Sequence, residues 1–331
     1  MSCTLAINIP FVLGRCDYYG RPLWHNVPPA TKHAYLDALV AEARATCPDV
    51  GTAGQTIDRI VFYNGSLGTV EPDRLHDLLR DLARLAPLAP DCRLSAEVDP
   101  GLVSTALIGE LRMHGLSCLR FHYLTSDAVE SERLERPCSA LEMAKTRIVM
   151  DAAGFHNCDI QVLVGFAGQA EKTLLKTLRD AVLVEGVTHC TLLRARGPLA
   201  SAPAEAEALT RVGAAFLEAH GLVGYAPGCF AREGHRLGWE AGWTGGAEPA
   251  GAAGDPTGTE ATEAAHAPTN AAAMETAVPA TESVLALGPG ARSRLGGLAW
   301  ENVTDLDAYI RANGDPAKLT ARIEELPSPL P

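Results

Sequence analysis

The residues best suited to chemistry lie in one short segment of the chain. The segment "SCLRFHYL" (117–124) is typical of a strand, and Arg120 and His122 are two residues apart in it, so they share one face. A histidine there can act as an acid, a base or a metal ligand, and an arginine can bind an anion. Glu97, in "EVDPG", is the obvious partner for a buried arginine, since buried charges need partners. The sequence predicts either a substrate site or an internal salt bridge from Arg120 to Glu97 or Asp99.

A second candidate is the lone cysteine of the first loop. The segment "INIPFVLGRCDYYGRPLW" (7–24) begins as an apolar strand, breaks at Pro10 and contains Cys16. Cys16 can be a leftover thiol, a reactive thiol or a single metal ligand, and nothing adjacent to it favours the thiolate. No two of the nine cysteines form a C-x-x-C pair, so the usual zinc signature is absent.

The elements that must position these residues alternate along the chain. Apolar, strand-like segments are each followed by a segment with helical periodicity. The six pairs are 4–11 and 33–47, 59–65 and 71–86, 93–100 and 104–115, 117–124 and 139–154, 158–166 and 170–186, and 189–196 and 204–221. Such alternation predicts an α/β fold with a parallel sheet or barrel, in which ligands bind at the carboxyl ends of the strands.

Composition limits the classes of partner. The net charge is −12, and an acidic surface repels phosphate backbones, so we expect no nucleic-acid partner. No apolar run approaches the roughly 18 residues that span a membrane. The start "MSCTLAINIPF" has neither a basic region nor a small-residue cleavage site, so we expect a cytoplasmic protein and no membrane association.

Five segments, taken in order, resemble one known family. The chain is similar to the radical S-adenosylmethionine (SAM) enzymes of the oxygen-independent coproporphyrinogen III oxidase family, including its haem-chaperone branch. The matching segments are "IPF" (9–11), "EVDPG" (97–101), "VGFAGQ" (164–169), "CFAREGH" (229–235) and "LGPGARSRLGG" (287–297). The resemblance implies a partial (βα)6 TIM-type barrel with a C-terminal extension, and we expect the family's helical C-terminal domain to be missing or reduced.

The resemblance divides the chain into four expected parts. The partial barrel takes residues 1–200, and a helix and loop that pack on it take 201–243. Residues 244–282 are mainly Ala, Gly, Thr, Pro and Glu, so we expect a disordered low-complexity insertion. Order returns in a C-terminal extension, 283–331.

The family's cluster motif is degenerate in this sequence. Family members carry C-x-x-x-C-x-x-C in the first loop, and the three positions here are Val12, Cys16 and Tyr19. Iron–sulfur clusters are held by soft thiolates, and one cysteine does not supply three of them. We therefore expect no [4Fe–4S] cluster and no radical chemistry. SAM, haem or a single metal stays open as a cofactor, with no metal-ligand set assigned.

The SAM pocket implied by the resemblance is altered as well. In the glycine-rich run, here "YNGSLGT", Tyr63 and Asn64 occupy glycine positions, where a side chain takes the space of a ligand. Gln161 stands at the family's aspartate position. Other altered positions are Ala6 and Asn8 on the first strand and Arg120, His122 and Leu124 on the fourth, whereas Glu97 is kept. The candidate catalytic residues are thus His122, Arg120, Glu97 and Tyr63. The candidate cofactor-binding residues are Asn64, Gln161, Cys16 and Tyr19.

Two functions fit these changes. The first is an enzyme repurposed for non-radical small-molecule chemistry, by acid–base or metal-assisted steps, in bacterial specialised metabolism, with its ligand in the barrel. The second is a non-catalytic module that binds haem or another tetrapyrrole, with Cys229 and His235 as candidate haem ligands, or that partners a complete radical SAM protein. An open, polar interior favours an enzyme or binder, and a filled interior favours a scaffold.

Overall fold

The computed structural model describes residues 2–14, 23–136, 139–183, 187–236 and 283–326. Its centre is one sheet with the strand order β14-β13-β12-β11-β1-β4-β5-β6-β7-β8-β10-β9. Six parallel strands form the predicted barrel part: β1 (Ser2–Ile9), β4 (Thr56–Asn64), β5 (Leu88–Val98), β6 (Leu116–Leu124), β7 (Cys158–Val164) and β8 (Val187–Arg194). The predicted α/β partial barrel is confirmed.

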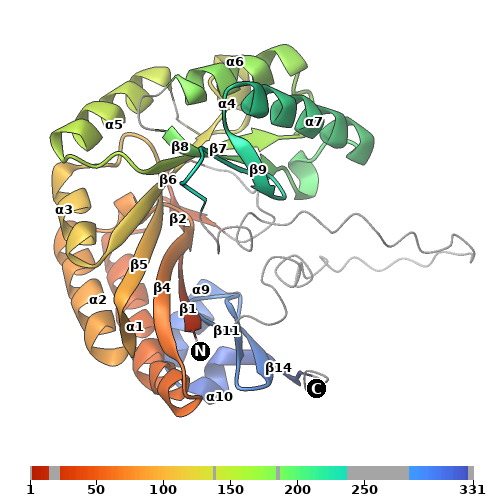
Figure 1. Cartoon of the computed structure of the whole chain (residues 1–331). Helices are drawn as coiled ribbons and strands as arrows, with labels where there is room; N and C mark the ends of the chain where they lie inside the picture. Colours follow the sequence, from red (N-terminus) through yellow and green to blue (C-terminus); the bar gives the residue numbers. More distant parts are fainter. Residues whose placement is uncertain (1, 15–22, 137–138, 184–186, 237–282, 327–331) are drawn as a thin grey trace, which may run out of the picture.

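Helices cover the outer, convex face of this sheet (Figure 1). They are α1 (Pro29–Thr52), α2 (Pro72–Leu85), α3 (Thr105–Met113), α4 (Ala128–Arg133), α5 (Ala140–Ala152), α6 (Glu171–Val182) and α7 (Pro203–Ala219). In α2 the buried side chains Leu75, Leu78, Leu79 and Leu82 recur at helical spacing and form one apolar stripe. Ser104 caps α3, because its side chain accepts a hydrogen bond from the Leu107 N–H at 3.1 Å. The short helix α4 was not predicted.

Further elements extend one edge of the sheet or form a small separate sheet. The strands β9 (Val223–Ala226) and β10 (Cys229–Ala231) add to β8, and the two-stranded sheet of β2 (Phe11–Val12) and β3 (Trp24–His25) follows β1. Short 3-10 turns span Leu67–Thr69 and Gly197–Leu199. The predicted insertion 244–282 lies outside the described residues. No helix within the described ranges is long and apolar enough to cross a membrane.

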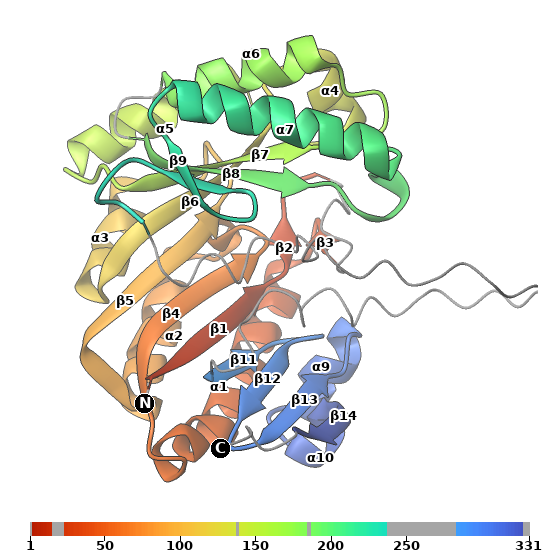
Figure 2. The ribbon, with the colours of Figure 1, turned by 45° about the vertical axis from the view of Figure 1, so that its right-hand side comes forward.

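The C-terminal extension continues the barrel sheet. Strand β11 (Ser283–Leu287) pairs parallel with β1, so it is a further parallel strand although it comes from the far end of the chain. Figure 2 shows the rest of the extension beside it: β12 (Arg292–Leu295), β13 (Leu298–Asn302), β14 (Thr320–Glu325), α9 (Leu306–Ala312) and α10 (Pro316–Leu319). The expected extension is therefore a structural part of the barrel edge.

One buried carboxyl ties the extension to α1. Glu42 is 1% exposed and accepts hydrogen bonds from the Gly288 N–H (2.9 Å), the Asn302 side-chain amide (2.6 Å) and the Tyr309 hydroxyl. Burial raises the pKa of Glu42 to about 7, against the lowering effect of these hydrogen bonds. The protonation state of Glu42 therefore affects how stably the extension packs against α1.

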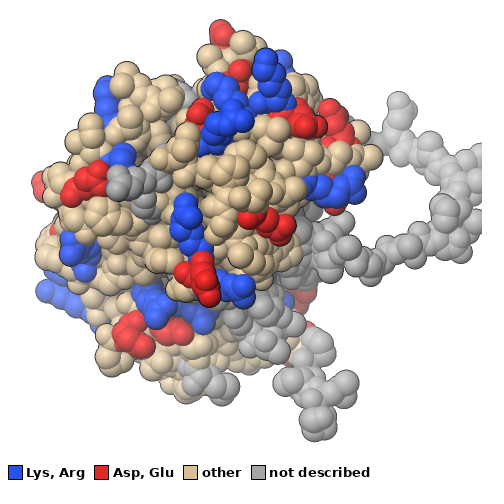
Figure 3. Space-filling model, turned by 45° about the horizontal axis from the view of Figure 1, so that its top comes forward, with Lys and Arg blue, Asp and Glu red and all other residues tan. Residues whose placement is uncertain are grey.

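The two faces of the sheet have different cores. The outer face packs against the helices in the main hydrophobic cluster, with residues such as Leu5, Phe62 and Leu285. The inner face carries a smaller apolar cluster of Ala6, Val61, Tyr63, Val284, Ala286 and Ala291. On the molecular face seen in Figure 3, positive and negative side chains are interspersed. Of the described candidate residues, Tyr63 belongs to this small cluster, and Glu97, Arg120, His122 and Gln161 lie on the inner face beyond it.

Candidate functional site

The register of the sheet places the candidate residues in two rows on the inner face. In the first row Glu97 on β5 pairs with Arg120 on β6, which pairs with Asp159 on β7. In the second row His122 pairs with Gln161. All five side chains are at most 4% exposed. The first row thus alternates a carboxylate, a guanidinium and a carboxylate across the neighbouring strands β5, β6 and β7.

Glu97 is at the centre of the hydrogen-bond network. One carboxylate oxygen, Oε2, accepts from the backbone N–H of Asn64 at 2.7 Å. The other, Oε1, accepts from Arg120 Nη1 at 3.3 Å and from Gln161 Nε2 at 3.1 Å. Burial alone would raise the pKa of Glu97, but His122, Arg120 and Gln161 together lower it to about 2. Glu97 is therefore an anion whose lone pairs already have protein donors.

Arg120 bridges two carboxylates. Its side chain is 0% exposed, and besides Glu97 it contacts Asp159, with Nε to Oδ2 at 3.1 Å. The Thr191 hydroxyl on β8 lies 2.9 Å and 2.8 Å from the two oxygens of Asp159. The predicted salt bridge to Glu97 is confirmed. The second carboxylate beside Arg120 is Asp159, which occupies the paired register position on β7, whereas Asp99 follows the end of β5 and forms an ion pair with Arg136.

His122 lies between two carboxylates at the carboxyl end of the strands. Its Nε2 is 3.5 Å from Glu97 Oε2, and its Nδ1 is 3.3 Å from Asp99 Oδ1. Arg136, which follows α4, forms an ion pair with the same Asp99 oxygen. Burial lowers the pKa of His122, but the hydrogen bonds and charges of Asp99 and Glu97 raise it above its usual value. Burial likewise raises the pKa of Asp99, but Arg136 and His122 bring it below the usual value.

The charges of this network balance. With His122 protonated there are three cations, Arg120, His122 and Arg136, and three anions, Glu97, Asp99 and Asp159. An imidazolium held between two carboxylates is a poor general base, because it already carries its proton. Among the described residues the charges of the network therefore cancel when His122 is protonated.

The two residues at predicted glycine positions lie at the end of β4. Asn64 has a backbone φ of +82°, a left-handed conformation that favours glycine, and its side chain donates to Asn8 Oδ1 at 3.0 Å. The next residue is a necessary glycine, since a Cβ on Gly65 would lie 2.2 Å from the Ile9 carbonyl oxygen. Tyr63 is 4% exposed and belongs to the inner apolar cluster. At this point Asn64 has a backbone conformation that favours glycine, Gly65 leaves no room for a side chain, and the side chains of Tyr63 and Asn64 are buried.

Comparison with known proteins identifies the fold. The chain is similar to coproporphyrinogen III oxidase (HemN) from Escherichia coli, a radical SAM enzyme, with a TM-score of 0.75 and 16% identity over 98% of this chain and 72% of HemN.

The chain has the HemN fold.

Two other solved structures are more distantly similar. SuiB from Streptococcus suis has a TM-score of 0.41 at 12% identity over 66% of this chain and 47% of SuiB. The FeFe-hydrogenase maturase HydG from Carboxydothermus hydrogenoformans has a TM-score of 0.38 at 11% identity, over 65% of this chain and 52% of HydG. No family model matches the sequence, and no curated protein matches it. At these identities the HemN likeness establishes the fold and leaves the activity open.

The residues of the HemN fold that would hold a cluster are only partly described. Cys16 and Tyr19 lie outside the described residues, and Val12 is a buried residue of β2. Burial raises the pKa of the thiols of Cys3 to about 11 and of Cys47 and Cys158 to about 12, so these cysteines stay protonated. Within the described ranges no group of three or more His, Cys, Asp and Glu residues can hold a metal ion. The described residues do not fit an iron–sulfur cluster.

Of the predicted site residues, the structure brings most together and adds others. Glu97, Arg120, His122, Gln161 and Asn64 form one network, and Tyr63 lies at its edge. Sequence reasoning missed Asp159, Thr191 and Arg136. The sequence could have indicated Asp159 as a site residue, because it lies two residues before Gln161 on a strand and therefore shares its face. Arg136 had none, since it reaches Asp99 from a connecting segment.

Proposed function

We propose that this chain is a cluster-less radical-SAM-like protein and acts as a non-catalytic module, a pseudoenzyme that partners another protein. The observation that carries the proposal is the filled interior beside Glu97. Arg120 and His122 are both 0% exposed there, and each contacts carboxylates of this chain. The resemblance assigns this region to the SAM pocket. Because the side chains of Arg120 and His122 occupy it, the residues present do not fit SAM.

The energetics favour a structural role for the network. Removing one partner of a buried ion pair leaves an uncompensated charge, so such networks fix one arrangement of the strands around them. The contacts to Glu97, Asp99 and Asp159 join β4, β5, β6, β7 and β8, and Arg136 adds the segment after α4. The network therefore joins the barrel strands to one another around Glu97.

Among the partners of the module hypothesis, the geometry favours a protein over haem. Cys229 is 1% exposed within β10, whereas His235 is exposed, so the two candidate haem ligands do not share an accessible site. A haem iron needs ligands that face a common open space. The proposed partner is therefore a protein, with a complete radical SAM enzyme as the candidate that the fold suggests.

The enzyme hypothesis is the second candidate, and it has one supporting observation. Asp99, His122 and Arg136 lie at the carboxyl end of the barrel strands, where barrel enzymes place their sites. Because the pKa of His122 is raised, it would act there as a proton donor in non-radical chemistry on a small molecule. A role in bacterial specialised metabolism belongs to this candidate.

Cluster reconstitution tests the proposal. The protein and its Cys16→Ser variant are treated anaerobically with iron and sulfide, and iron content and visible absorbance are measured after desalting. We expect the same low iron content in both proteins, because one thiolate does not anchor a cluster. Iron near four atoms per chain that is lost in Cys16→Ser contradicts the proposal.

A thermal-shift screen separates the two candidates. SAM, haem, divalent metals and small organic acids are added to the protein and to His122→Gln. The module proposal predicts that no added ligand raises the melting temperature of the protein through His122. A ligand that stabilises the protein but not folded His122→Gln supports the enzyme candidate instead.

A further inference from the structure

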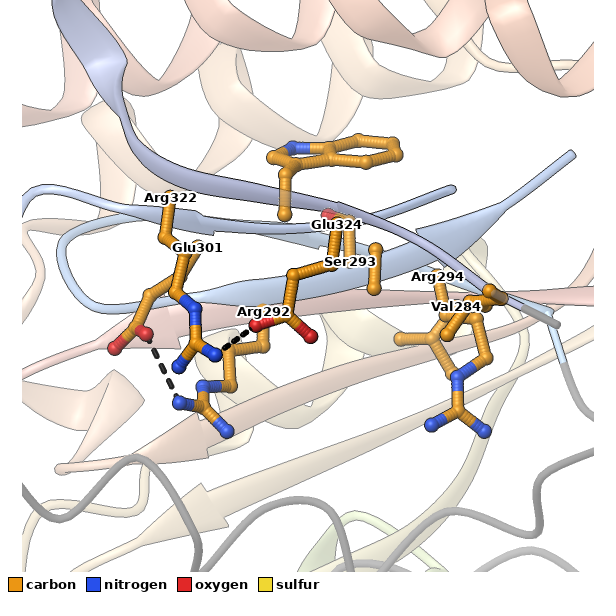
Figure 4. Close-up of a pocket in the computed structure, with 10 residues that line it drawn as sticks. Val284, Arg292, Ser293, Arg294, Glu301, Arg322 and Glu324 are labelled. Carbon is orange, nitrogen blue, oxygen red and sulfur yellow. Dashed lines mark hydrogen bonds and ion pairs between the residues drawn. The ribbon is translucent and has the colours of Figure 1, made fainter. Parts of the chain in front are cut away.

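The C-terminal extension carries arginines on the inner face of the sheet. Arg292 and Arg294 are two residues apart on β12, so they point to one side, and Arg322 on β14 pairs with Glu301 on β13. Figure 4 shows the side chains of this group around a common hollow. Val284 of the inner apolar cluster lines the same hollow, which places it on the barrel's inner side.

Two of the three arginines have carboxylate partners. Arg292 Nη2 lies 2.9 Å from Glu301 Oε2, and Arg322 forms an ion pair with Glu324. Arg294 makes no side-chain hydrogen bond or ion pair with the described part of the chain. The five charged residues that line the hollow therefore leave one positive charge, and it lies on Arg294.

The cross-strand neighbours of Arg294 are apolar. In the strand register it faces Val284 on β11 and Ala299 on β13. Val284 continues the inner apolar cluster, which includes Ala286 and Tyr63. A partly open hollow with a volume of about 70 Å³ is lined by Val284, Arg294 and Ala299, and Trp300 and Leu326 add further apolar surface. The hollow therefore places the guanidinium of Arg294 beside the apolar side chains of Val284 and Ala299.

We propose that this hollow binds a small organic monocarboxylate with an apolar body. The carboxylate pairs with the guanidinium of Arg294, whose planar donors match it in a bidentate arrangement. The apolar body packs on Val284 and Ala299. A dianion such as a phosphate monoester is disfavoured, because Glu301 and Glu324 lie near the same hollow and repel a second negative charge. The site exists whether or not the barrel catalyses a reaction.

The test uses three probes with one ring and different head groups: phenylacetate, phenylacetamide and phenyl phosphate. Each is titrated into the full-length protein by ligand-observed NMR. We expect saturable binding of phenylacetate, at least tenfold weaker binding of phenyl phosphate, and no saturable binding of the amide.

Variants then locate the site. Arg294→Gln should weaken phenylacetate binding at least tenfold, and Arg294→Lys, which keeps the charge without the fork, should weaken it less. The matched control is Arg211→Gln on α7, an exposed arginine far from the hollow in the fold, which should bind as the parent does. Circular dichroism checks folding, and Arg294→Lys is the deciding variant if Arg294→Gln unfolds. No saturable phenylacetate binding, tighter binding of phenyl phosphate, or unchanged binding by the Arg294 variants overturns the proposal.

Discussion

Arginine side chains lie on the inner face of one continuous sheet in two places, and the two places differ in burial and in pairing. In the barrel, Arg120 is fully buried and bridges Glu97 and Asp159. In the extension, the Arg292 side chain is 17% exposed and has one carboxylate partner, and Arg294 has none among the described residues. The Arg120 network fills the interior of the barrel, whereas the extension leaves a hollow beside Arg294.

This difference shows that the burial and pairing of an arginine decide its role more than the residue type does. A buried arginine is tolerated only with partners, and then its removal is costly. A partly exposed arginine keeps its hydration, contributes little to stability and stays available to a ligand. The barrel network is therefore expected to act on the stability of the fold, and the extension on binding.

The largest expected effect comes from Arg120→Met. The change roughly keeps the volume of the side chain but leaves the buried carboxylates of Glu97 and Asp159 without their guanidinium partner, which should cost roughly 3–5 kcal/mol of unfolding free energy. Urea unfolding followed by circular dichroism measures it. The triple change Arg120→Met, Glu97→Gln and Asp159→Asn removes the stranded charges and should recover most of the loss. A loss below about 1 kcal/mol in the single variant would mean that the network is not structural.

The docking of the extension should depend on pH through Glu42. The folded pKa of about 7 lies above the ordinary 4.5, so its stability contribution is complete below pH 4.5 and is lost as pH rises to about 7. A shift of this size corresponds to at most about 3 kcal/mol. Glu42→Gln should flatten the fall in stability between pH 4.5 and 7, measured by urea unfolding at several pH values. The same slope in protein and variant would contradict the role of Glu42.

A smaller effect is expected at Asn64. Its left-handed backbone costs a residue with a Cβ about 1–2 kcal/mol, which glycine avoids and asparagine partly tolerates. Asn64→Ala should therefore be less stable than Asn64→Gly by about 1 kcal/mol, although both lose the hydrogen bond to Asn8. Thermal unfolding compares the two variants. Equal stability would show that the backbone at this position relaxes.

The smallest effect is expected for Arg292→Met, the counterpart of Arg120→Met in the extension. Its partly exposed pair with Glu301 should contribute about 0–1 kcal/mol. The same urea unfolding measures it, and a loss as large as that of Arg120→Met would remove the contrast between the two regions.

Much of the fold could be predicted from the sequence, because the six βα units are local patterns. The pairing of Arg120 with Glu97 also followed from strand periodicity and the need of a buried charge for a partner. The parallel pairing of β11 with β1 could not be predicted, since no local signal brings residues 283–287 beside residues 3–7. The strand spacing of Asp159 from Gln161 indicated a shared face, but its position beside Arg120 could not be predicted, because strand register is set by tertiary packing.

Reductive cleavage of SAM tests the central claim most directly. The anaerobically reconstituted protein is incubated with SAM and dithionite, and 5′-deoxyadenosine is measured by chromatography against the Cys16→Ser variant. We predict no 5′-deoxyadenosine above the level of the variant, because Arg120 and His122 fill the interior and one thiolate does not hold a cluster. Multiple turnovers of 5′-deoxyadenosine that disappear in Cys16→Ser would contradict the account.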